Sequence, residues 1–455
     1  MNLPDYFLAD LPAEAALTAA MVTDACHTLK RNRDHYLASR STESLIHTIA
    51  TLAENWRQPD DPFRRRALEL GPGATGFSRA TLLRGLDAFF GELTPESIHA
   101  LIAQELGHPE RLDQFVATPT EERSSRFARA CGPTMLVHIG AGNVPNPTLM
   151  CIILGLLVRS AQFVKCASGS SFLPRLFAHS LYAVEPKLGA CLEIAEWRGG
   201  RADLEEALFA EADCVTVTGT DETVAEVRRK LPARARLVEH GNRVSLGYIA
   251  HDVLSSFNAR KLAAQAADDV VAWDQQGCLS PHLFYVERGG SISPEQFAEM
   301  LAGELARREE AEPRGELSVE EAAAITARRG FYEVREATAM SARSWSSHGS
   351  TAWTVIYEAD PLFQLSCLNR FVYVKEVATL EDALKGAEAV RGKTSTVSLA
   401  APESRAKRMA MDLACWGATR ICPVGRMQRP PLMWRQDGRP GLADLVVWTD
   451  WEKPL

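Results

Sequence analysis

Apolar side chains in the first 130 residues recur at the three-to-four spacing of amphipathic helices. The spacing is regular over residues 11–32 and 42–56, and residues 94–96 (Thr-Pro-Glu) have the composition of a helix start. The glycine-rich stretch GPGATGFS, residues 71–78, interrupts the pattern and predicts a loop. We therefore expect residues 1–130 to form a helical N-terminal part that packs on the domain that follows.

From residue 133 the pattern changes to short apolar runs that alternate with amphipathic segments. The runs TMLVHI, QFVKCA and CVTVTGT have strand character, and the segments PTLMCIILGLLVRS and DETVAEVRRKL have helical character. This alternation predicts a largely parallel, doubly wound sheet, because parallel strands need a helical crossover. A helix at 257–273 followed by a strand at 283–288 starts the alternation again, which predicts a second α/β unit.

These patterns predict an α/β fold class with two doubly wound domains and a helical N-terminal segment. The expected ranges are 1–130 for the helical part, 131–250 for a Rossmann-like domain, 251–430 for the second α/β domain and 431–455 for a C-terminal tail strand.

Composition narrows the classes of protein that the chain can represent. Hydrophobic residues make up 46% of the 455 residues and charged residues 24%, as in ordinary globular proteins. The formal net charge of -8 argues against a protein whose main task is to bind nucleic acid, because that task needs a basic face. The ten cysteines contain no C-x-x-C pair, so neither a zinc site nor a disulfide framework is predicted. We expect no metal and a reducing, cytoplasmic location.

The chain has no segment typical of membrane insertion. Its start lacks a basic region followed by an apolar one, which argues against a signal peptide. The longest apolar run, residues 148–158, is shorter than the roughly 20 residues of a membrane-spanning helix. We expect a buried helix there and no integral membrane segment.

The first candidate for chemistry is the turn HIGAGNVPNP, residues 138–147. Gly140 and Gly142 permit a tight turn between a strand and a helix, and the helix N-terminus can face an anion. The amide of Asn143 can donate to an oxyanion, but it can also cap the helix, and the glycine turn can serve packing alone.

Two further segments have the character of a nucleotide site. Lys165 ends a strand, and the turn Thr218, Gly219 and Thr220 precedes a helix whose backbone amides can hold a pyrophosphate. Alternatively, Lys165 is simply exposed at the end of its strand, and the T-G-T turn only caps the helix that follows it.

Cys278 lies in DQQGCLSPH, residues 274–282, between a predicted helix and a predicted strand. A nucleophilic cysteine must be partly exposed and must lose its proton readily. Its loop neighbours favour exposure, whereas Cys151, Cys166 and Cys214 lie within apolar runs and have the character of core residues. His282 points into the following strand, and we interpret it as structural.

In this order, the Asn143 turn, Lys165, the T-G-T turn, VEHG with Glu239, and QGC resemble the aldehyde dehydrogenase superfamily. Within it, four stretches resemble the acyl-CoA reductase branch, the LuxC-type fatty acid reductase component of bacterial bioluminescence. They are ELGHPERLDQF, DQQGCLSPH, LNRFVYV and WRQDGRPGLADLVVWTDWE. The resemblance extends from about residue 70 to the end of the chain, and it implies an aldehyde dehydrogenase-like fold.

The resemblance also implies a reaction. Cys278 would attack an acyl thioester, Asn143 and the Cys278 backbone amide would form the oxyanion hole, and hydride from a nicotinamide would yield an aldehyde. Glu239 falls where aldehyde-oxidising relatives have their general base, and its role here stays open between base, proton relay and structural carboxylate. The acyl donor would be an acyl-CoA or an acyl-carrier or acyl-transferase protein, and a homo-oligomer is expected.

The resemblance assigns the cofactor groove to Lys165, Ser168 and the T-G-T turn. Ser168 stands where NAD-dependent relatives carry a glutamate that binds the adenosine ribose. Loss of that carboxylate relieves repulsion toward a 2′-phosphate, which Lys165 can attract, so NADPH is favoured over NADH. The carboxylate that usually holds the nicotinamide ribose has no counterpart near Ser366 and Cys367.

Two other functions remain as alternatives to an NADPH-dependent acyl-thioester reductase. One is an NAD(P)-dependent aldehyde dehydrogenase with Glu239 as its base, and the other is a cofactor-free cysteine acyltransferase. The reductase hypothesis predicts that Cys278 and Asn143 converge at one cleft, with Lys165 and the T-G-T turn beside it.

Overall fold

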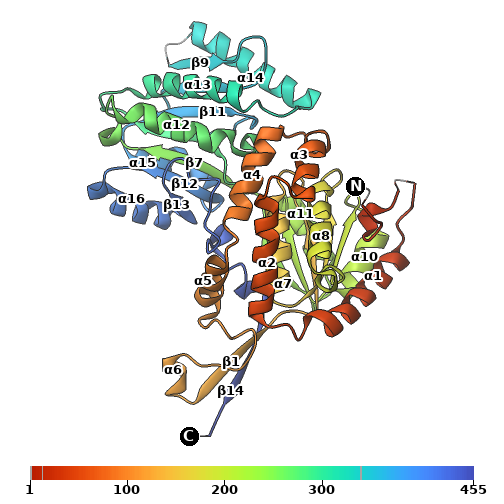
Figure 1. Ribbon diagram of the computed structural model, residues 1–455. Helices are drawn as coiled ribbons and strands as arrows, with labels where there is room; N and C mark the ends of the chain where they lie inside the picture. Colours follow the sequence, from red (N-terminus) through yellow and green to blue (C-terminus); the bar gives the residue numbers. More distant parts are fainter. Residues whose placement is uncertain (1–2, 13, 339–340, 455) are drawn as a thin grey trace.

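The computed structural model describes residues 3–12, 14–338 and 341–454, and Figure 1 shows how their helices and strands are arranged. The N-terminal part is mainly helical, as predicted. Thr94 Oγ1 accepts a hydrogen bond from the backbone amide of Ser97 at 3.2 Å, and Pro95 begins the helix, so the predicted helix start is confirmed. The helices here are α1 (Ala19–Asn32), α2 (Thr42–Arg57), α3 (Pro62–Thr75), α4 (Arg79–Gly91), α5 (Pro95–Leu106) and α6 (Pro119–Glu122), with short helices η1 (Leu8–Asp10) and η2 (Arg33–Leu37).

The predicted loop at 71–78 is wrong over most of its length. Helix α3 continues through Gly71 and Pro72 and ends at Thr75, where Gly76 takes the left-handed conformation with φ of 78°. Gly71 is buried, and a Cβ there would lie 2.6 Å from Leu82 Cδ1. Close packing of α3 on α4 therefore accounts for a glycine that local pattern assigns to a loop.

The next segment forms the predicted parallel, doubly wound sheet. In the described part of the chain this sheet has five strands in the order β4-β3-β2-β5-β6, and every neighbouring pair is parallel. The strand order reverses between β2 and β5, and such a reversal opens a crevice at the carboxyl ends of the strands. The strands are β2 (Met135–Ile139), β3 (Ala161–Cys166), β4 (Leu192–Glu196), β5 (Cys214–Thr218) and β6 (Arg236–His240), and the helices are α7 (Asn146–Leu157), α8 (Phe172–Val184), α9 (Pro186–Gly189), α10 (Ala202–Glu211) and α11 (Asp221–Lys230).

A second sheet carries the rest of the α/β pattern. Its described strands number seven, in the order β13-β12-β7-β8-β11-β10-β9, and only β9 runs antiparallel to its neighbour. The strands are β7 (Val244–Ile249), β8 (Pro281–Glu287), β9 (Ala342–Ser346), β10 (Thr354–Glu358), β11 (Phe371–Val377), β12 (Thr394–Ala400) and β13 (Arg420–Cys422). The helices are α12 (Asn258–Val271), α13 (Pro294–Ala311), α14 (Val319–Thr338), α15 (Leu380–Gly386) and α16 (Glu403–Trp416), with short helices η3 (His251–Val253), η4 (Ala272–Gln275) and η5 (Glu388–Val390).

Strand β7 corrects the expected boundary at residue 250. It pairs with β8 and β12 of the larger sheet, so the chain passes from the first sheet to the second in the few residues between His240 and Val244. A strand pattern alone does not say which sheet a strand joins, because both sheets bury both of their faces.

Two distant segments form an arm that projects from the body of the molecule in Figure 1. β1 (Arg126–Cys131) pairs antiparallel with β14 (Val447–Glu452), which is the predicted tail strand. Short helices η6 (Gln436–Gly438) and η7 (Ala443–Leu445) precede β14. No helix in the described ranges is long and apolar enough to cross a membrane.

The N-terminal helices share one apolar core with the five-stranded sheet. Trp56 stacks on Phe90 with ring centroids 4.9 Å apart, Phe90 stacks on Phe177 at 6.1 Å, and Trp56 Nε1 donates to Ser180 Oγ at 2.8 Å. Because Phe177 and Ser180 belong to α8, these contacts attach α2 and α4 to the first α/β domain.

Two loops of the second domain are held together by a buried ion pair. Residues 273–275 and 368–370 each adopt three consecutive left-handed conformations, with φ between 48° and 65°. Such conformations cost on the order of 1–3 kcal/mol each in non-glycine residues and persist only where the surroundings enforce them. Arg370 Nε donates to Asp274 Oδ1 at 3.0 Å, and the two side chains are 0% and 2% exposed. Burial raises the pKa of Asp274 even though Arg370 opposes that shift.

Amide hydrogen bonds join the same two loops. Gln275 Nε2 donates to the carbonyl of Phe371 at 2.8 Å, and Gln276 Nε2 donates to Asn369 Oδ1 at 2.9 Å. The first loop leads directly to Cys278, so this clamp fixes the backbone that carries the candidate nucleophile.

Replacing Arg370 by methionine should lower the free energy of unfolding by about 3–5 kcal/mol, because Asp274 would stay buried without its charged partner. Urea-induced unfolding followed by tryptophan fluorescence measures the change. Arg391→Met, which removes an exposed pair with Glu388, is the matched control, with an expected change below about 1 kcal/mol. Equal losses in the two variants would contradict a clamp at Arg370.

Candidate functional site

A cavity of about 680 Å³ lies where the carboxyl ends of β2, β3 and β5 meet the Cys278 loop. The predicted site residues that line it are Asn143, Lys165, Ser168, Thr218, Gly219, Thr220 and Cys278. The cavity therefore joins side chains that are far apart in the sequence, as expected from the reversal of strand order between β2 and β5.

Asn143 is anchored at the N-terminal side of α7. Its Nδ2 donates to the carbonyl of Gln276 at 2.6 Å, two residues before Cys278. An amide group has two N–H donors, so this bond orients the group and leaves one donor for another acceptor. Asn143 accepts no cap hydrogen bond from α7, because the N-cap position is Pro145. This geometry suits an oxyanion-binding amide better than a helix cap.

Cys278 is less accessible than its loop neighbours predict. Its thiol is half-buried, and its carbonyl accepts a hydrogen bond from Ser245 Oγ at 2.8 Å. Burial raises the pKa of the Cys278 thiol to about 12, with Asp437 adding to the shift and Arg243 opposing it. In this state the thiol keeps its proton at neutral pH, so nucleophilic attack requires a base.

Lys165 is a buried cation at the end of β3. Burial lowers the pKa of its ammonium, which lies 5.9 Å from the centroid of the Trp197 ring. Among the described residues it has no hydrogen bond or ion pair within the usual distance limits, and it lines the cavity with Ser168. The charges of Glu205, Glu196 and Glu226 oppose this lowering of the pKa. An ammonium that lines the cavity suits a phosphate or a ribose hydroxyl.

Arg198 also lines this part of the cavity, and sequence reasoning missed it. It follows β4, is exposed, and makes no ion pair with another described residue. Its position shortly after the buried strand β4 could have indicated a binding role, because binding residues of parallel sheets gather at the carboxyl ends of the strands. Lys165 and Arg198 bring two cations to this cavity, and Glu205 and Glu226 line it as well.

Glu239 does not line the cavity. Its carboxylate forms an ion pair with Arg228 of α11, and the pair lies at the surface, with side chains 32% and 61% exposed. The neighbouring residue, His240, faces the C-terminal segment instead, where its Nδ1 contacts Asp437 Oδ2 at 3.0 Å. The two side chains alternate because successive residues of a strand point to opposite faces.

His282 and Leu368 complete the cavity near Cys278. His282 Nδ1 contacts Ser366 Oγ at 3.0 Å, and burial lowers the pKa of the imidazole to about 4. A neutral ring held by a serine agrees with the structural interpretation of His282. Ser366 and Cys367, where relatives carry a ribose-binding carboxylate, do not line the cavity, whereas Leu368 does, and the nearby Asn369 accepts a hydrogen bond from Gln276.

A smaller apolar pocket of about 160 Å³ meets Cys278 from another direction. Helix α7 contributes Met150 and Leu154, α4 and α5 contribute Phe89 and Leu101, and the loop of the nucleophile contributes Leu279. Cys278 and Gly277 line both this pocket and the polar cavity. The thiol therefore lies between a polar chamber and an apolar one.

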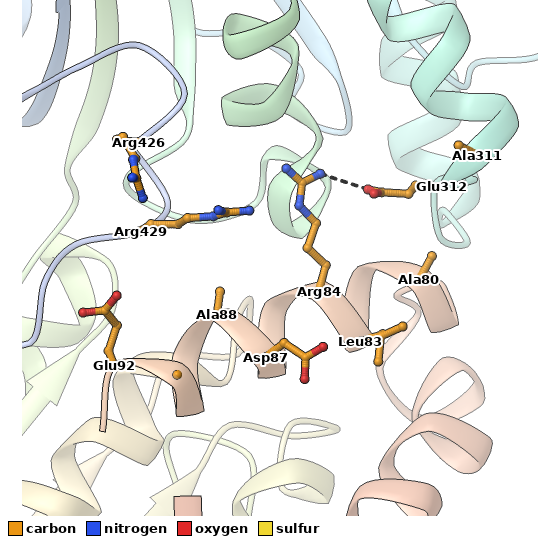
Figure 2. A pocket seen from close by; sticks show the side chains of 11 residues that line it. Ala80, Leu83, Arg84, Asp87, Ala88, Glu92, Ala311, Glu312, Arg426 and Arg429 are labelled. Atoms are coloured by element: carbon orange, nitrogen blue, oxygen red, sulfur yellow. Dashed lines mark hydrogen bonds and ion pairs between the residues drawn. The ribbon is translucent and has the colours of Figure 1, made fainter. Parts of the chain in front are cut away.

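The apolar pocket adjoins a third cavity of about 680 Å³ between α4, the end of α13 and the loop after β13. Figure 2 shows this cavity, with the guanidinium groups of Arg426 and Arg429 directed into it and Arg84 paired with Glu312. Ala88, Glu92 and Arg429 line both spaces. The apolar pocket is therefore continuous at one end with this polar cavity.

One cluster in the described residues has the composition of a metal site. It consists of His251, Asp252 and Glu287. Arg405 already forms ion pairs with both carboxylates, and Tyr248 also donates to Glu287. These partners account for the cluster without a cation.

Solved structures of similar fold are aldehyde dehydrogenases. A putative aldehyde dehydrogenase of Anabaena variabilis has a TM-score of 0.71 and 16% identity, covering 96% of this chain and 93% of that one. An indole-3-acetaldehyde dehydrogenase of P. syringae, solved in complex with NAD+, has a TM-score of 0.71 and 15% identity, covering 96% and 89%. The predicted aldehyde dehydrogenase-like fold is confirmed.

Sequence comparison identifies a narrower group. The long-chain acyl-protein thioester reductase of Photorhabdus laumondii is 22% identical over 417 residues, 90% of this chain and 82% of the relative. The enzyme of the same name from Vibrio harveyi is 21% identical over 435 residues, 94% and 86%. The family model described as Acyl-CoA reductase (LuxC) matches residues 37–448. Because the family model matches most of the length of this chain, the chain belongs to the acyl-CoA reductase (LuxC) family.

Proposed function

We propose that the protein reduces a long-chain acyl thioester to the aldehyde with NADPH, through an acyl-enzyme on Cys278. The observation that carries the proposal is the position of Cys278, which lines both a polar cavity and an apolar pocket. An acyl chain needs the apolar space, a dinucleotide needs the polar one, and the reacting carbonyl must meet both.

Cys278 and Asn143 have separate roles in the proposed reaction. The Cys278 thiolate attacks the thioester carbonyl, and the free N–H of Asn143 stabilises the negative charge that develops on oxygen. The leaving thiol departs and the acyl group stays on sulfur, where the carbonyl remains activated. When bound, the nicotinamide supplies a hydride to that carbon. Collapse of the resulting oxyanion expels the Cys278 thiolate and releases the aldehyde.

The position of Glu239 favours reduction over aldehyde oxidation. An aldehyde dehydrogenase must activate water to hydrolyse its acyl-enzyme, which requires a base beside the nucleophile. Glu239 is paired with Arg228 at the surface and does not line the cavity that holds Cys278. A carboxylate in that position does not activate water at the thioester, so the acyl group persists until hydride arrives.

The choice of NADPH rests on Lys165, Ser168 and Arg198. Lys165 and Arg198 have no described ion-pair partner, and position 168 offers a hydroxyl in place of a carboxylate that would repel a 2′-phosphate. Glu205 and Glu226 line the same cavity, so the two cations also balance their charge. The N-terminus of α11 and the T-G-T turn at the same cavity offer backbone donors for the pyrophosphate. These residues fit the cofactor that the proposal needs.

The proposed donor is an acyl-protein or acyl-CoA thioester, and the proposed assembly is a homo-oligomer. The exposed apolar side chains of Val447, Trp448 and Trp451 on the arm support an interface there.

Cys278→Ala should abolish NADPH oxidation with acyl thioester substrates, because no acyl-enzyme forms. Absorbance at the nicotinamide band measures turnover, and intact-protein mass spectrometry measures the acyl adduct. Cys415→Ala removes an exposed thiol outside the cavities and is the control that retains both signals. An adduct of equal size on the Cys278→Ala protein would exclude the assigned nucleophile.

Arg198→Ala should raise the KM for NADPH about tenfold or more and leave the KM for NADH nearly unchanged, because only NADPH loses a charge-assisted hydrogen bond. Steady-state kinetics with both cofactors measure the two values. Arg201→Ala, which removes a surface pair with Asp203, is the matched control. An equal rise for both cofactors would argue against a contact with the 2′-phosphate.

Leu154→Trp should shift the preferred acyl chain to shorter lengths by filling the apolar pocket. If the pocket no longer holds two methylene groups of the acyl chain, about 1.6 kcal/mol of apolar binding free energy is lost. This loss lowers kcat/KM for the longest substrates about tenfold. The measurement is kcat/KM over a series of acyl-CoA chain lengths. Leu154→Met conserves the volume and should keep the original profile. An unchanged profile in Leu154→Trp would place the acyl chain elsewhere.

A further inference from the structure

We propose that Arg426 and Arg429 bind a phosphate of the acyl donor, at the outer end of the route by which the donor reaches Cys278. This inference rests on the proposed function and narrows its substrate to a thioester whose leaving thiol carries a phosphate. Acyl-CoA and an acyl group on the phosphopantetheine arm of a carrier protein share that chemistry. The third cavity, which the two arginines line, has no lining residue in common with the polar cavity assigned to the cofactor.

The apolar pocket connects Cys278 with the third cavity. Cys278 and Arg429 both line the pocket, and Arg429 also lines the cavity shown in Figure 2. The residues common to both spaces are Ala88 of α4, Glu92 at its C-terminal cap, and Arg429 in the loop after β13. Leu154 of α7 lines the pocket but not the cavity. An acyl chain along α7 and a donor arm between α4 and the loop can therefore leave the reacting carbonyl in different directions.

The loop after β13 lies against the loop of the nucleophile. A Cβ at Gly277, the residue before Cys278, would lie 3.0 Å from Gln428 Nε2. The same Nε2 donates a hydrogen bond to Ser280 Oγ. Gln428 therefore lies beside the nucleophile loop on both sides of Cys278, and Arg429 follows it directly in the chain. These contacts set the position of Arg429 relative to the thiol.

Buried groups hold the backbone of the arginine loop. Asp269, which is 1% exposed, accepts hydrogen bonds from two backbone amides of the loop at 2.6 and 2.8 Å. The guanidinium of Arg420 donates to the carbonyls of Met427 at 2.6 Å and Arg426 at 2.8 Å. The amide of Arg429 donates to the carbonyl of Arg426 at 3.2 Å. The backbone that carries the two arginines is therefore preorganised, which lowers the entropic cost of binding a ligand.

The side chains of the two arginines have no partner within the described part of the chain. Both are exposed, and neither guanidinium forms a hydrogen bond or an ion pair with another described residue. Arg84, the third guanidinium of the cavity, is already paired with Asp268 and Glu312. A phosphate can accept paired hydrogen bonds from the planar fork of a guanidinium, so two free guanidinium groups directed into one cavity suit this ligand.

Three carboxylates also line the third cavity. Asp87 pairs with the buried Arg64, and Glu312 pairs with Arg84, so both carboxylates already have a cationic partner. Glu92 forms no ion pair with another described residue and lines both the cavity and the apolar pocket. Its charge repels a phosphate, so Glu92 should limit the affinity that the two unpaired arginines provide.

The test compares two substrates that differ in phosphate. Dodecanoyl-CoA and dodecanoyl-pantetheine present the same acyl chain and the same pantetheine group, but only the first carries phosphate. In the double variant Arg426→Gln/Arg429→Gln, the KM for dodecanoyl-CoA at saturating NADPH should rise at least tenfold, because charge-assisted hydrogen bonds are lost. The KM for dodecanoyl-pantetheine should stay within about twofold of wild type. An unchanged KM for dodecanoyl-CoA, or equal rises for both substrates, would overturn the inference.

Arg435→Gln is the matched control. Arg435 lies further along the same segment, is exposed and lines none of the three cavities. Its replacement removes the same charge, and both KM values should stay within about twofold of wild type. A rise as large as that of the double variant would assign the effect to overall charge and would contradict a local phosphate site.

Glu92→Gln should change the KM for dodecanoyl-CoA in the opposite direction. Removal of the repulsive carboxylate should lower this KM about twofold to threefold, and the decrease should shrink at high salt. The KM for dodecanoyl-pantetheine should stay the same. An equal decrease for both substrates would assign the effect to the apolar pocket and would contradict recognition of phosphate.

A carrier-bound substrate distinguishes the two sources of the phosphate. A dodecanoyl group on an acyl carrier protein has the phosphate of the pantetheine arm but lacks the nucleotide of CoA. A higher KM for both phosphate-bearing donors in the double variant would identify the arm phosphate as the ligand. A higher KM for dodecanoyl-CoA alone would identify the phosphates of the nucleotide. Both results support the phosphate site.

Binding of CoA to the Cys278→Ala protein locates the site without turnover. Calorimetry should give the same Kd for CoA with and without saturating NADP+, because the two cavities share no lining residue. Loss of CoA binding on addition of NADP+ would place the donor in the polar cavity, which would overturn the inference and leave the proposed function intact. A wild-type protein that forms no aldehyde from any of the three donors with NADPH would instead refute the proposed function.

Discussion

The ion pair between Arg370 and Asp274 is the contact on which the geometry of the site depends. Six non-glycine residues in two loops adopt left-handed conformations, which only Asp274 and Asn369 among them adopt readily, and this buried pair joins the loops. The first loop presents the carbonyl of Gln276 to Asn143 and carries Cys278 two residues later. The second contributes Leu368 to the cavity wall. Release of the clamp would move Cys278, its contact with Asn143 and the cavity wall together.

Burial of Cys278 is consistent with the chemistry of a thioester intermediate. In the proposed reaction, the half-buried position of the thiol between an apolar pocket and a polar cavity would limit the access of water to an acyl group that waits for hydride. The same burial makes the thiolate costly to form, as the raised pKa of Cys278 indicates. Glu239 does not line the cavity that Cys278 lines, so in the proposed reaction its carboxylate does not activate water at the acyl-enzyme.

Much of the site could be predicted because chemistry-bearing residues follow buried strands. Asn143, Lys165 and the T-G-T turn lie at or shortly after the carboxyl ends of β2, β3 and β5, and parallel strands bring these ends to one edge. Arg198 has the same position after β4 but lies in no recognised motif. The resemblance directed attention to Glu239, and its pairing with Arg228 outside the cavity was not visible in the sequence. Which side of β6 a residue faces depends on strand register, and a shift of one residue reverses the face.

Sequence by itself determined the types and order of the elements, the two α/β units and the cysteine with loop character. These depend on local periodicity and turn composition, which act over a few residues. Tertiary structure alone decided that β7 joins the larger sheet, that α3 continues through Gly71, and that Cys278 lies between two unlike chambers. Those outcomes depend on pairing and packing between residues that are distant along the chain, and no local pattern records which partner a strand or a side chain will meet.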